Sequence, residues 1–579
     1  MSNNELDLLQ AARCEDLVYE QIPELTVLGK YERKVVDTLK QMGAHLLQGS
    51  RGVGKSMLMR QAEVELDDDF SEERKLAVYV SFKTSTLLEG VKADERNAFQ
   101  VWVGVKILQA LYEKLLMLDV IGNEKVDDPY SRVFGFKSGK KTSDILREKI
   151  HKLQKLATVK NNGREELISE IGKEFLDKVN DITFINELIK DIMKEYNINK
   201  INFLFDEAAH TFIPEQQEIF FEIFKLLHGG EIAVKAAVYP TVTSYGRNFE
   251  IGQDAIVIKM DRFETGLAGR KTNRELYRSI LLKRLPQKGK LRKDILSKGK
   301  ILDQCIDLST GNPRSFLHLL NSTIDKGYSD RALLLATQEF VDTSLLPYHN
   351  NLTKRLPKYS HHVRTGIDLL KDYIIPQIRE KNHRKKKKQY QSAYFTIQRD
   401  MSPNLKLALD ILCYSGVLSN QGTVKIADRK TGLRYMVHLA ILFTQRAFLF
   451  SDLHEAIKSL SLTDYREFNK NDPNIESYLL ALKEASDKCP NCSTEVPANA
   501  KFCSECGMKI DVKSIVGSLL DEPVSELEIG KRLAARVKTH YPCVGDVIQA
   551  TREELKGIKY IKEVRSRIIK NAAEEFISG

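Results

Sequence analysis

The sequence predicts a multidomain chain whose front half is an α/β core with a mostly parallel sheet. Two observations carry this prediction. Five short apolar segments alternate with helical patterns up to residue 260, as in strands joined by crossover helices. The first segment runs directly into a glycine-rich loop that opens a helix. The predicted strands are residues 45–48, 76–82, 201–207, 232–239 and 255–260.

The composition is that of a soluble globular protein. The 579 residues allow roughly three or four domains of ~150 residues each. The chain is 42% hydrophobic and 29% charged, and its net charge of +10 permits a polyanion partner without requiring one. No apolar run reaches the ~18 residues of a membrane span, and residues 1–5 lack the features of a signal peptide. We therefore expect a cytoplasmic protein without a membrane partner.

The glycine-rich loop after the first strand fits the pattern G-x-x-x-x-G-K-[ST]. Its glycines let backbone N–H groups approach phosphates, its lysine reaches the β- and γ-phosphates, and its serine hydroxyl can bind Mg²⁺. The helix that begins at the serine turns its N-terminus toward the same anion. The sequence therefore predicts a site for ATP and Mg²⁺. The predicted nucleotide-binding residues are Gly49, Ser50, Arg51, Gly52, Val53, Gly54, Lys55, Ser56 and Met57.

Two acids end the third predicted strand, where residues 201–205 lead into Asp206 and Glu207. Asp206 would share Mg²⁺ with Ser56. Glu207 would orient and deprotonate the attacking water. The alternative is a strand followed by an acid that caps a helix start. The glycine-rich loop upstream favours the catalytic interpretation, because a Mg²⁺-nucleotide site needs both parts.

The fourth predicted strand ends in a cluster of hydroxyl residues, Thr241, Thr243 and Ser244. One of them, with Thr241 the best candidate, could bond the γ-phosphate or the attacking water. A turn that caps its own backbone is an equal alternative. Arg247 follows closely along the chain.

Helical patterns fill the rest of the front half. Residues 120–198 indicate a helical insertion on one side of the sheet, and Trp102 is most simply a core residue. Residues 1–30 form a lead-in of the kind that often covers the adenine side of a nucleotide. Residues 272–326 are helical again. Within them the turn Gly311-Asn312-Pro313-Arg314 starts a helix from which Arg314 can face the phosphates.

Together, the glycine-rich loop, the acid pair, Pro240-Thr241 and Gly311-Asn312-Pro313-Arg314 resemble the AAA+ ATPases over about residues 20–330. The closest branches are the origin-recognition and replication-initiator proteins and the related STAND signalling ATPases. The resemblance implies that Arg314 senses the γ-phosphate, as Thr241 would. It also implies that Arg247 acts as an arginine finger across the interface of a homo-oligomer, with a surface arginine as the alternative. The implied catalytic residues are Lys55, Asp206, Glu207, Arg247 and Arg314.

The back half begins with a region that resembles the winged helix that commonly follows this ATPase core. Residues 405–415 form an amphipathic helix pattern, and residues 416–426 indicate strand, turn and strand. A basic run upstream could lie on a phosphate backbone, or it could be a solvated loop. The nucleic-acid candidates in this run are Lys385, Lys386, Lys387 and Lys388.

Two C-x-x-C pairs close together predict a zinc site, and clustered cysteines in a reducing compartment indicate metal rather than disulfides. The predicted ligands are Cys489, Cys492, Cys503 and Cys506. Four thiolates make a closed tetrahedral site, so the role is structural and not catalytic. The spacing resembles the short zinc ribbons of many prokaryotic proteins. The ribbon's own partner, protein or nucleic acid, stays open.

The last seventy residues indicate compact helices whose order resembles the helix-hairpin-helix fold in the C-terminal domain of the RNA polymerase alpha chain. Thr551 and Glu554 form a capping box, and Gly557 stands in the hairpin. Such hairpins offer backbone N–H groups to DNA phosphates. Lys562 takes the place of the usual second glycine, so binding by charge is expected instead, with protein binding as the alternative. The candidates are Lys559, Lys562, Arg565 and Arg567.

The sequence thus predicts an ATP-binding and ATP-hydrolysing AAA+-like protein that acts on, or is recruited to, double-stranded DNA. One alternative is a STAND-type signalling or antiviral defence switch that oligomerises and works with a separate protein effector. Another is a nucleotide-gated scaffold with little turnover. The predicted domains are residues 1–265 (ATPase core), 266–335 (helical lid), 336–450 (winged-helix-like), 451–487 (helical connector), 488–510 (zinc ribbon) and 511–579 (helix-hairpin-helix).

Overall fold

The structure is a computed structural model, and most of the chain is described in it. The described residues are 8–83, 85–88, 91–122, 128–136, 140–156, 161–207, 214–240, 242–260, 267–356, 359–384, 390–426, 430–448, 453–483, 487–488, 491–492, 494–496, 505–508 and 519–578. Across these ranges, none of the helices combines the length and the apolar character that crossing a membrane requires.

A five-stranded sheet forms the centre of the front half. Its strands are β1 (Ala44–Gln48), β2 (Lys75–Ser81), β5 (Lys200–Asp206), β6 (Ile232–Val238) and β7 (Ile256–Lys259). They run in the order β2-β5-β6-β1-β7, and all neighbours are parallel. The α/β core with a parallel sheet is therefore confirmed. The order leaves one strand, β6, between the strand before the glycine-rich loop and the strand before the two acids.

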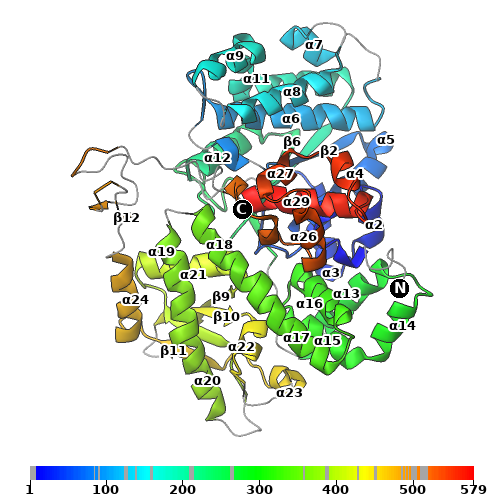
Figure 1. Ribbon diagram of the computed structural model, residues 1–579. Coiled ribbons are helices and arrows are strands. Elements are labelled where there is room, and N and C mark those ends of the chain that lie inside the picture. The colour runs from blue at the N-terminus through cyan, green and yellow to red at the C-terminus, as the bar shows by residue number, and fades with distance from the viewer. Residues whose placement is uncertain are drawn as a thin grey trace.

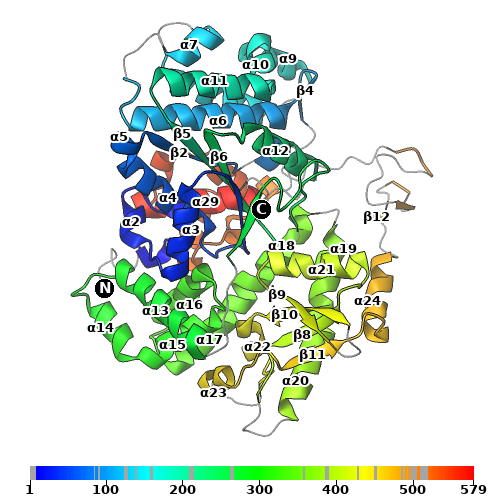
Figure 2. The ribbon, with the colours of Figure 1, turned by 180° about the vertical axis from the view of Figure 1, so that it is seen from behind.

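Helices cover both faces of this sheet because successive strand residues point to opposite sides. Leu47, Leu204 and Ala237 pack against α3 (Lys30–Lys40) and α4 (Lys55–Asp68). The residues before them in each strand, with Phe205, belong to the cluster on the other face. That face is covered by α6 (Ala98–Met117) and α12 (Pro214–Leu227). Figure 2 shows α6 on one side of the sheet and α3 with α4 on the other.

Further helices stack on α6, away from the sheet (Figure 1). They occupy the stretch predicted as a helical insertion, and Trp102 is buried beneath them at 1% exposure. The insertion helices are α7 (Pro129–Phe134), α8 (Thr142–Lys155), α9 (Asn161–Ile171), α10 (Lys173–Asn180) and α11 (Ile182–Glu195). The smaller elements of the front half are η1 (Cys14–Asp16), α2 (Gln21–Leu25), α5 (Phe70–Glu73), η2 (Ser85–Leu88), β3 (Lys92–Ala93) and β4 (Arg96–Asn97).

The lid and the second sheet share one apolar core. The helices from the lid onward are α13 (Leu267–Arg284), α14 (Lys290–Ser297), α15 (Gly299–Leu308), α16 (Pro313–Asp325), α17 (Asp330–Phe340), η3 (Val341–Leu345), α18 (Leu346–Arg355), α19 (Ser360–Asp368), η5 (Leu369–Ile374) and α20 (Ile375–His383). The boundary predicted between residues 335 and 336 falls inside α17, which continues through η3 into α18. Lid and second sheet are therefore packed as one lobe.

The second sheet has the order β11-β8-β10-β9. Its strands are β8 (Tyr394–Gln398), β9 (Leu418–Lys425), β10 (Thr431–Val437) and β11 (Tyr465–Phe468). The helices around it are α21 (Pro403–Tyr414), α22 (Leu439–Thr444), α23 (Leu453–Lys458) and α24 (Pro473–Lys483). A helix followed by a hairpin, α21 then β9–β10, gives the winged-helix-like arrangement that the sequence predicts.

Two details of this region correct the sequence prediction. Residues 418–425 form one strand instead of strand, turn and strand. Gly422 has a φ of +82°, but it lies within a strand whose pairing with β10 shifts register between Leu433 and Tyr435, and it does not reverse the chain. The predicted helical connector also contains a strand, β11, which pairs in parallel with β8 at the edge of the sheet.

The C-terminal tail has its own apolar core, formed by residues between Leu519 and Ile577. Its elements are η7 (Val524–Glu526), α26 (Lys531–Lys538), α27 (Val544–Gln549), α28 (Arg552–Lys556) and α29 (Glu563–Ser578). The predicted capping box is present: Thr551 N–H donates to Glu554 Oε2 at 2.7 Å, and Glu554 N–H donates to Thr551 Oγ1 at 3.3 Å. The tail lies against the middle of the molecule, next to the front-half core and α18 (Figure 1).

Candidate nucleotide-binding site

The glycine-rich loop joins the end of β1 to the start of α4. Gly52 and Gly54 have φ values of +84° and +97°. This left-handed region favours glycine, because it has no Cβ to clash with the following carbonyl. The N-terminal N–H groups of the 14-residue helix α4 point into the loop. The loop therefore has the backbone shape that a phosphate cradle requires.

Lys55 folds back over this loop. Its Nζ donates to Gly49 O at 2.6 Å and to Ser50 O at 3.0 Å, and it lies 4.1 Å from the ring centroid of Tyr239. The side chain is 6% exposed. The ammonium group is thus held against the carbonyl groups of the first two residues of the loop.

The two predicted acids lie at the end of β5. They line the same cavity as Lys55. Asp206 Oδ2 accepts from Tyr79 Oη at 2.6 Å, and Asp206 Oδ1 accepts from Glu207 N at 2.9 Å. Glu207 has a φ of +60°, a conformation that non-glycine residues adopt mainly where surrounding structure enforces it. Burial raises the pKa of Glu207 to about 8; Lys83 opposes this rise, and Glu15 and Asp206 add to it.

The lid turn is bonded directly to the glycine-rich loop. Asn312 caps α16, since its Oδ1 accepts from Ser315 N at 3.1 Å. The same amide donates through Nδ2 to Arg51 O at 2.7 Å, and Arg314 N–H donates to Gly52 O at 3.4 Å. These bonds place the Arg314 side chain beside the loop, as the sequence predicts.

Most of these groups line one cavity of about 190 Å³. Its charged and polar lining includes residues of the loop, the acid pair and the lid, namely Arg51, Lys55, Ser56, Asp206, Glu207 and Arg314. Apolar residues of the lead-in and of α13 line it too, namely Ala12, Leu25, Val27, Leu276, Tyr277 and Ile280, together with the polar residues Glu32, Asn273 and Arg284. A cavity whose lining combines charged and apolar side chains suits a nucleotide, because its phosphates and its base have these opposite requirements.

Several residues of the cavity were not predicted from the sequence. Arg13 and Glu15 come from the lead-in, Tyr239 directly follows β6, and Glu575 comes from α29. Tyr239 could have been found from its place at the end of a predicted strand. Arg13 and Glu575 carry no local signal, since each is one charged residue in a segment without a motif.

The hydroxyl residues after β6 and Arg247 differ from the cavity residues in where they lie and what they bond. Thr243 Oγ1 accepts from Tyr239 N at 3.2 Å and donates to Tyr239 O at 2.9 Å, so this threonine caps its own turn. Thr241 lies outside the described residues. Arg247 is exposed on the loop after β6 and does not line the cavity.

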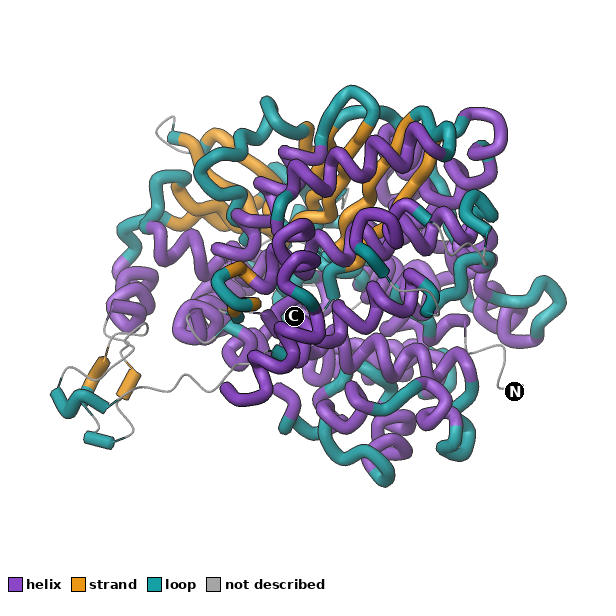
Figure 3. The backbone as a smooth tube through the Cα atoms, turned by 90° about the horizontal axis from the view of Figure 1, so that it is seen from above, coloured by secondary structure: helices purple, strands orange, loops and turns teal. Residues whose placement is uncertain are grey.

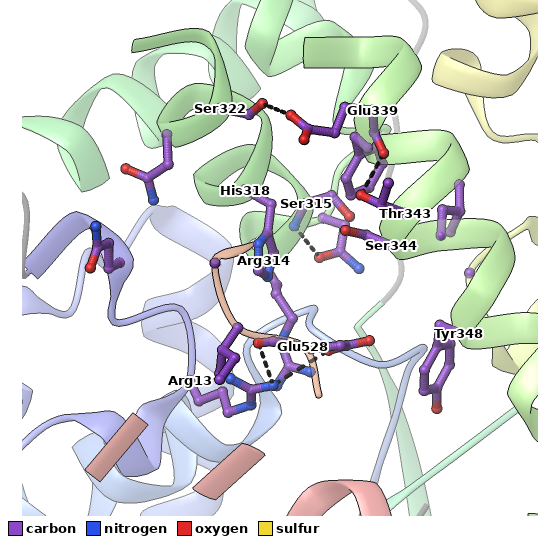
Figure 4. Close-up of a pocket in the computed structure, with 18 of the residues that line it drawn as sticks. Arg13, Arg314, Ser315, His318, Ser322, Glu339, Thr343, Ser344, Tyr348 and Glu528 are labelled. Atoms are coloured by element: carbon purple, nitrogen blue, oxygen red, sulfur yellow. Dashed lines mark hydrogen bonds and ion pairs between the residues drawn. The ribbon is translucent and has the colours of Figure 1, made fainter. Parts of the chain in front are cut away.

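A larger cavity of about 850 Å³ lies on the other side of the arginines. Its walls come from α16, from α17 to α18 and from the tail, and Figure 4 shows Arg13, Arg314 and Glu528 together at one end of it. Ser322 Oγ donates to Glu339 Oε2 at 2.8 Å within its wall. Arg13, Arg51 and Arg314 line both cavities and therefore stand between them.

The predicted nucleic-acid residues differ in how exposed they are. Lys559 and Lys562 are exposed, and Arg565 Nη1 donates to Tyr560 O at 3.0 Å. Arg567 is 8% exposed, and its Nη1 donates to Asp16 O at 3.4 Å. Arg567 therefore faces the front-half core and is not accessible in this arrangement, which corrects its prediction as a nucleic-acid contact. The lysines at 385–388 lie outside the described residues.

Two short strands, β12 (Asp487–Lys488) and β13 (Glu495–Val496), pair in antiparallel fashion around the first cysteine pair. They stand apart from the rest of the chain (Figure 3). Cys492 and Cys506 are exposed, whereas Cys489 and Cys503 lie outside the described residues. Among the residues that are described, no group of three or more potential metal ligands is assembled.

Comparison with protein families confirms the predicted ribbon, because residues 488–510 match the zinc-ribbon domain family. All four predicted zinc ligands fall within this match. No curated protein matches the chain significantly.

The solved structures that are similar to this chain include two proteins of Aeropyrum pernix. The Orc1 protein of Aeropyrum pernix, in complex with DNA, is 12% identical, with 77% of this chain and 96% of that chain covered at a TM-score of 0.30. The Orc2 protein of Aeropyrum pernix, in ADPNP–ADP complexes, is 9% identical, with 79% and 96% covered at a TM-score of 0.31. TM-scores below 0.5 assign neither a family nor an activity to this chain. The fold and the motifs on it define the class. The protein is a multidomain chain with a helical lid and an α/β core whose glycine-rich loop, residues 49–56, is a P-loop.

Proposed function

We propose that this chain binds and hydrolyses ATP, and that its nucleotide state is coupled to rearrangement of its lobes. The observation that supports the proposal is the cavity of about 190 Å³. It brings together the lysine of the glycine-rich loop, both acids and the lid arginine, and apolar residues of the lead-in and of α13 line the same cavity.

The P-loop N–H groups and Lys55 hold the phosphates. The adjacent oxygen donors fit a Mg²⁺ ion, because the Asp206 carboxylate and the Ser56 hydroxyl line the same cavity and are hard ligands. The ion would neutralise charge on the phosphates. Glu207 orients the attacking water and takes its proton. Arg314 contacts the terminal phosphate from the lid, so the lid position responds to the nucleotide.

Arg247 has a separate role in the proposal. It is exposed and lies away from the cavity of its own chain. An arginine so placed can reach a phosphate only in a neighbouring protomer, as an arginine finger does. We therefore assign Arg247 to the interface of a homo-oligomer.

The tail and the ribbon serve as recruiting modules for double-stranded DNA. Lys559 and Lys562 are exposed on the hairpin before α29, and Tyr560 beside them is 54% exposed. The net charge of +10 is compatible with a phosphate backbone. The ribbon's four cysteines fit Zn²⁺ as a structural ion, since thiolates are the preferred donors of closed zinc sites.

Steady-state ATP hydrolysis tests the proposal, with wild type and Glu207→Gln compared with and without double-stranded DNA over a salt series. We expect DNA to raise the wild-type rate, salt to remove the effect, and Glu207→Gln to lower turnover by about 100-fold or more. Lys559→Ala should reduce the salt dependence of DNA binding by about one charge. Wild-type protein that binds no ATP would refute the nucleotide site, and a rate unchanged by DNA would refute only the DNA role.

A second candidate function is a STAND-type switch for signalling or antiviral defence, working with a separate effector. The observation that favours it is the position of the tail, which contacts the P-loop arginine and the lid arginine at once. A switch of this kind would hydrolyse ATP only when a protein partner is added, whereas the first function requires stimulation by DNA. Binding without turnover under either condition would indicate a nucleotide-gated scaffold.

A further inference from the structure

The last helix of the chain brings a carboxylate into the cavity assigned to the nucleotide. Glu575 of α29 lines that cavity together with Arg13, Arg51 and Arg314. Its Oε1 accepts from Arg314 Nη1 at 2.8 Å and from Arg51 Nε at 3.0 Å. Its Oε2 pairs with Arg13. Glu575 is 5% exposed, so these are buried contacts.

The groups that hold Glu575 are those that would hold a phosphate. Arg51 lies in the P-loop, and Arg314 is the lid arginine. A guanidinium fork binds carboxylate and phosphate oxygens with the same geometry. Burial alone would raise the pKa of Glu575, but Arg13, Arg314 and Arg51 outweigh it and hold that pKa well below its ordinary value. The side chain is therefore an anion at neutral pH, like the phosphate.

Several further contacts between tail and core are polar. Asn571 Nδ2 donates to Asp16 Oδ1 at 3.0 Å, and Lys354 pairs with Glu522 at 2.8 Å. Further pairs join Lys531 to Glu339 at 2.9 Å and Arg13 to Glu528 at 3.4 Å. None of the buried apolar residues in the tail's cluster comes from another part of the described chain.

A polar contact around a self-contained core indicates a docked unit that can separate. The apolar cluster of the tail is made of tail residues alone, so the tail keeps a core of its own when it leaves. Leaving is resisted chiefly by the buried charges around Glu575, since the arginines would lose their counter-ion. A nucleotide would supply a replacement anion at the same place.

We propose that Glu575 is an internal competitor for the terminal phosphate of the nucleotide, so that docking of the tail and binding of ATP exclude each other. This inference rests on the proposed function, because it needs the cavity to be the nucleotide site. In the docked state the Glu575 carboxylate binds Arg51 and Arg314. When ATP binds, its phosphate takes these arginines, and α29 is released together with the exposed lysines of the tail.

The test measures the affinity of full-length protein for a fluorescent ATP analogue. Glu575→Gln keeps the shape of the side chain and removes its charge. We expect it to bind the analogue about tenfold more tightly than wild type, since removing one partner of a buried charge pair costs at least that factor. Glu574→Gln is the matched control. It is the adjacent carboxylate on α29, it forms no ion pair with the described residues, and it should leave the affinity unchanged.

A second variant separates competition from a local change of charge. Asn571→Ala removes a docking hydrogen bond to Asp16 and leaves Glu575 and all three arginines in place. Competition predicts tighter ATP binding here too, by about threefold for the loss of one hydrogen bond. Hydrogen exchange provides a readout of docking itself: adding ATP to wild type should speed exchange of the amides in α29.

The outcomes distinguish the two proposals. If wild type binds the analogue and Glu575→Gln binds it no more tightly, competition is refuted and the nucleotide site stands. Unchanged exchange in α29 on saturation with ATP refutes competition equally. If neither wild type nor Glu575→Gln binds the analogue, the nucleotide site is wrong, and the competition falls with it.

Discussion

The phosphate end of the cavity and the tail that closes it are built in opposite ways. The phosphate end comes from short stretches of chain in which loop, strand end and helix start are fixed by local geometry. The tail contact joins residues that are far apart, with a sequence separation of 562 between Arg13 and Glu575 and of 261 between Arg314 and Glu575. The phosphate end can be recognised in a sequence because its chemistry requires particular residue types at fixed spacing. The tail contact exists only once four separate segments, namely the lead-in, the glycine-rich loop, the lid and the tail, have folded and met.

Removing the charge of the P-loop lysine, Lys55, is the strongest test of the phosphate end of the cavity. Lys55→Ala should weaken ATP binding by about 100-fold, because it deletes a charge-assisted contact inside a mostly buried site. Titration with a fluorescent ATP analogue measures the loss. Lys30→Ala, at the exposed start of α3, is the matched lysine control and should bind as wild type does. Equal affinities for the two variants would show that the loop does not hold phosphate.

The elements that the sequence predicted correctly are those whose cause is local. The five strands are apolar runs, the α16 turn carries its own cap at Asn312, and Thr551 bonds to a glutamate three residues on. Each can be inferred from a window of a few residues. The cavity end formed by Lys55 and the two acids follows, since parallel strands bring their ends to one edge.

The elements that the sequence did not predict depend on distant partners. Residues 465–468 become a strand only because β8 offers a free edge for parallel pairing. Gly422 looked like a turn, but a long hairpin with β10 keeps it within a strand. Arg567 looked like a surface cation until the docking of α29 buried it against Asp16. Glu575 belongs to this group, and no pattern within α29 marks it.

A double-mutant cycle measures the coupling between the phosphate end of the cavity and the tail contact. If Arg314 serves both ATP and Glu575, then Arg314→Ala in wild type loses a phosphate contact but also loosens the tail, and the two effects partly cancel. In the Glu575→Gln background only the phosphate contact remains to be lost. We therefore expect Arg314→Ala to weaken ATP binding about tenfold more in Glu575→Gln than in wild type. Additive effects would show that Arg314 does not connect the two.

The packing of the lid on the P-loop gives a smaller effect with a matched pair of glycines. Gly52 and Gly54 both have positive φ, so alanine strains the backbone at either position. A Cβ at Gly52 would lie 2.7 Å from Asn312 Oδ1 and 2.8 Å from Arg314 Cβ, whereas a Cβ at Gly54 would meet nothing within 4 Å.

Gly52→Ala should therefore weaken ATP binding about fivefold more than Gly54→Ala, an overpacking effect of ~1 kcal/mol. The ATP analogue measures both variants, and thermal unfolding reports whether the lid has also loosened. Equal losses for the two glycines would mean that the lid turn is free to move away from the loop.

The zinc ribbon provides the smallest expected effect and the sharpest contrast with the tail. Both follow the lobes in the chain, but the ribbon's strands stand apart (Figure 3), whereas α29 reaches the cavity. Elemental analysis should find about one zinc ion per chain, lost in Cys492→Ser, because a four-thiolate site needs every ligand. Affinity for the ATP analogue should change less than twofold in that variant, since none of the ribbon residues that the structure describes lines the cavity. A larger change would mean that the ribbon acts on the nucleotide site through the tail to which it is joined, and that Glu575 is only one part of a longer connection.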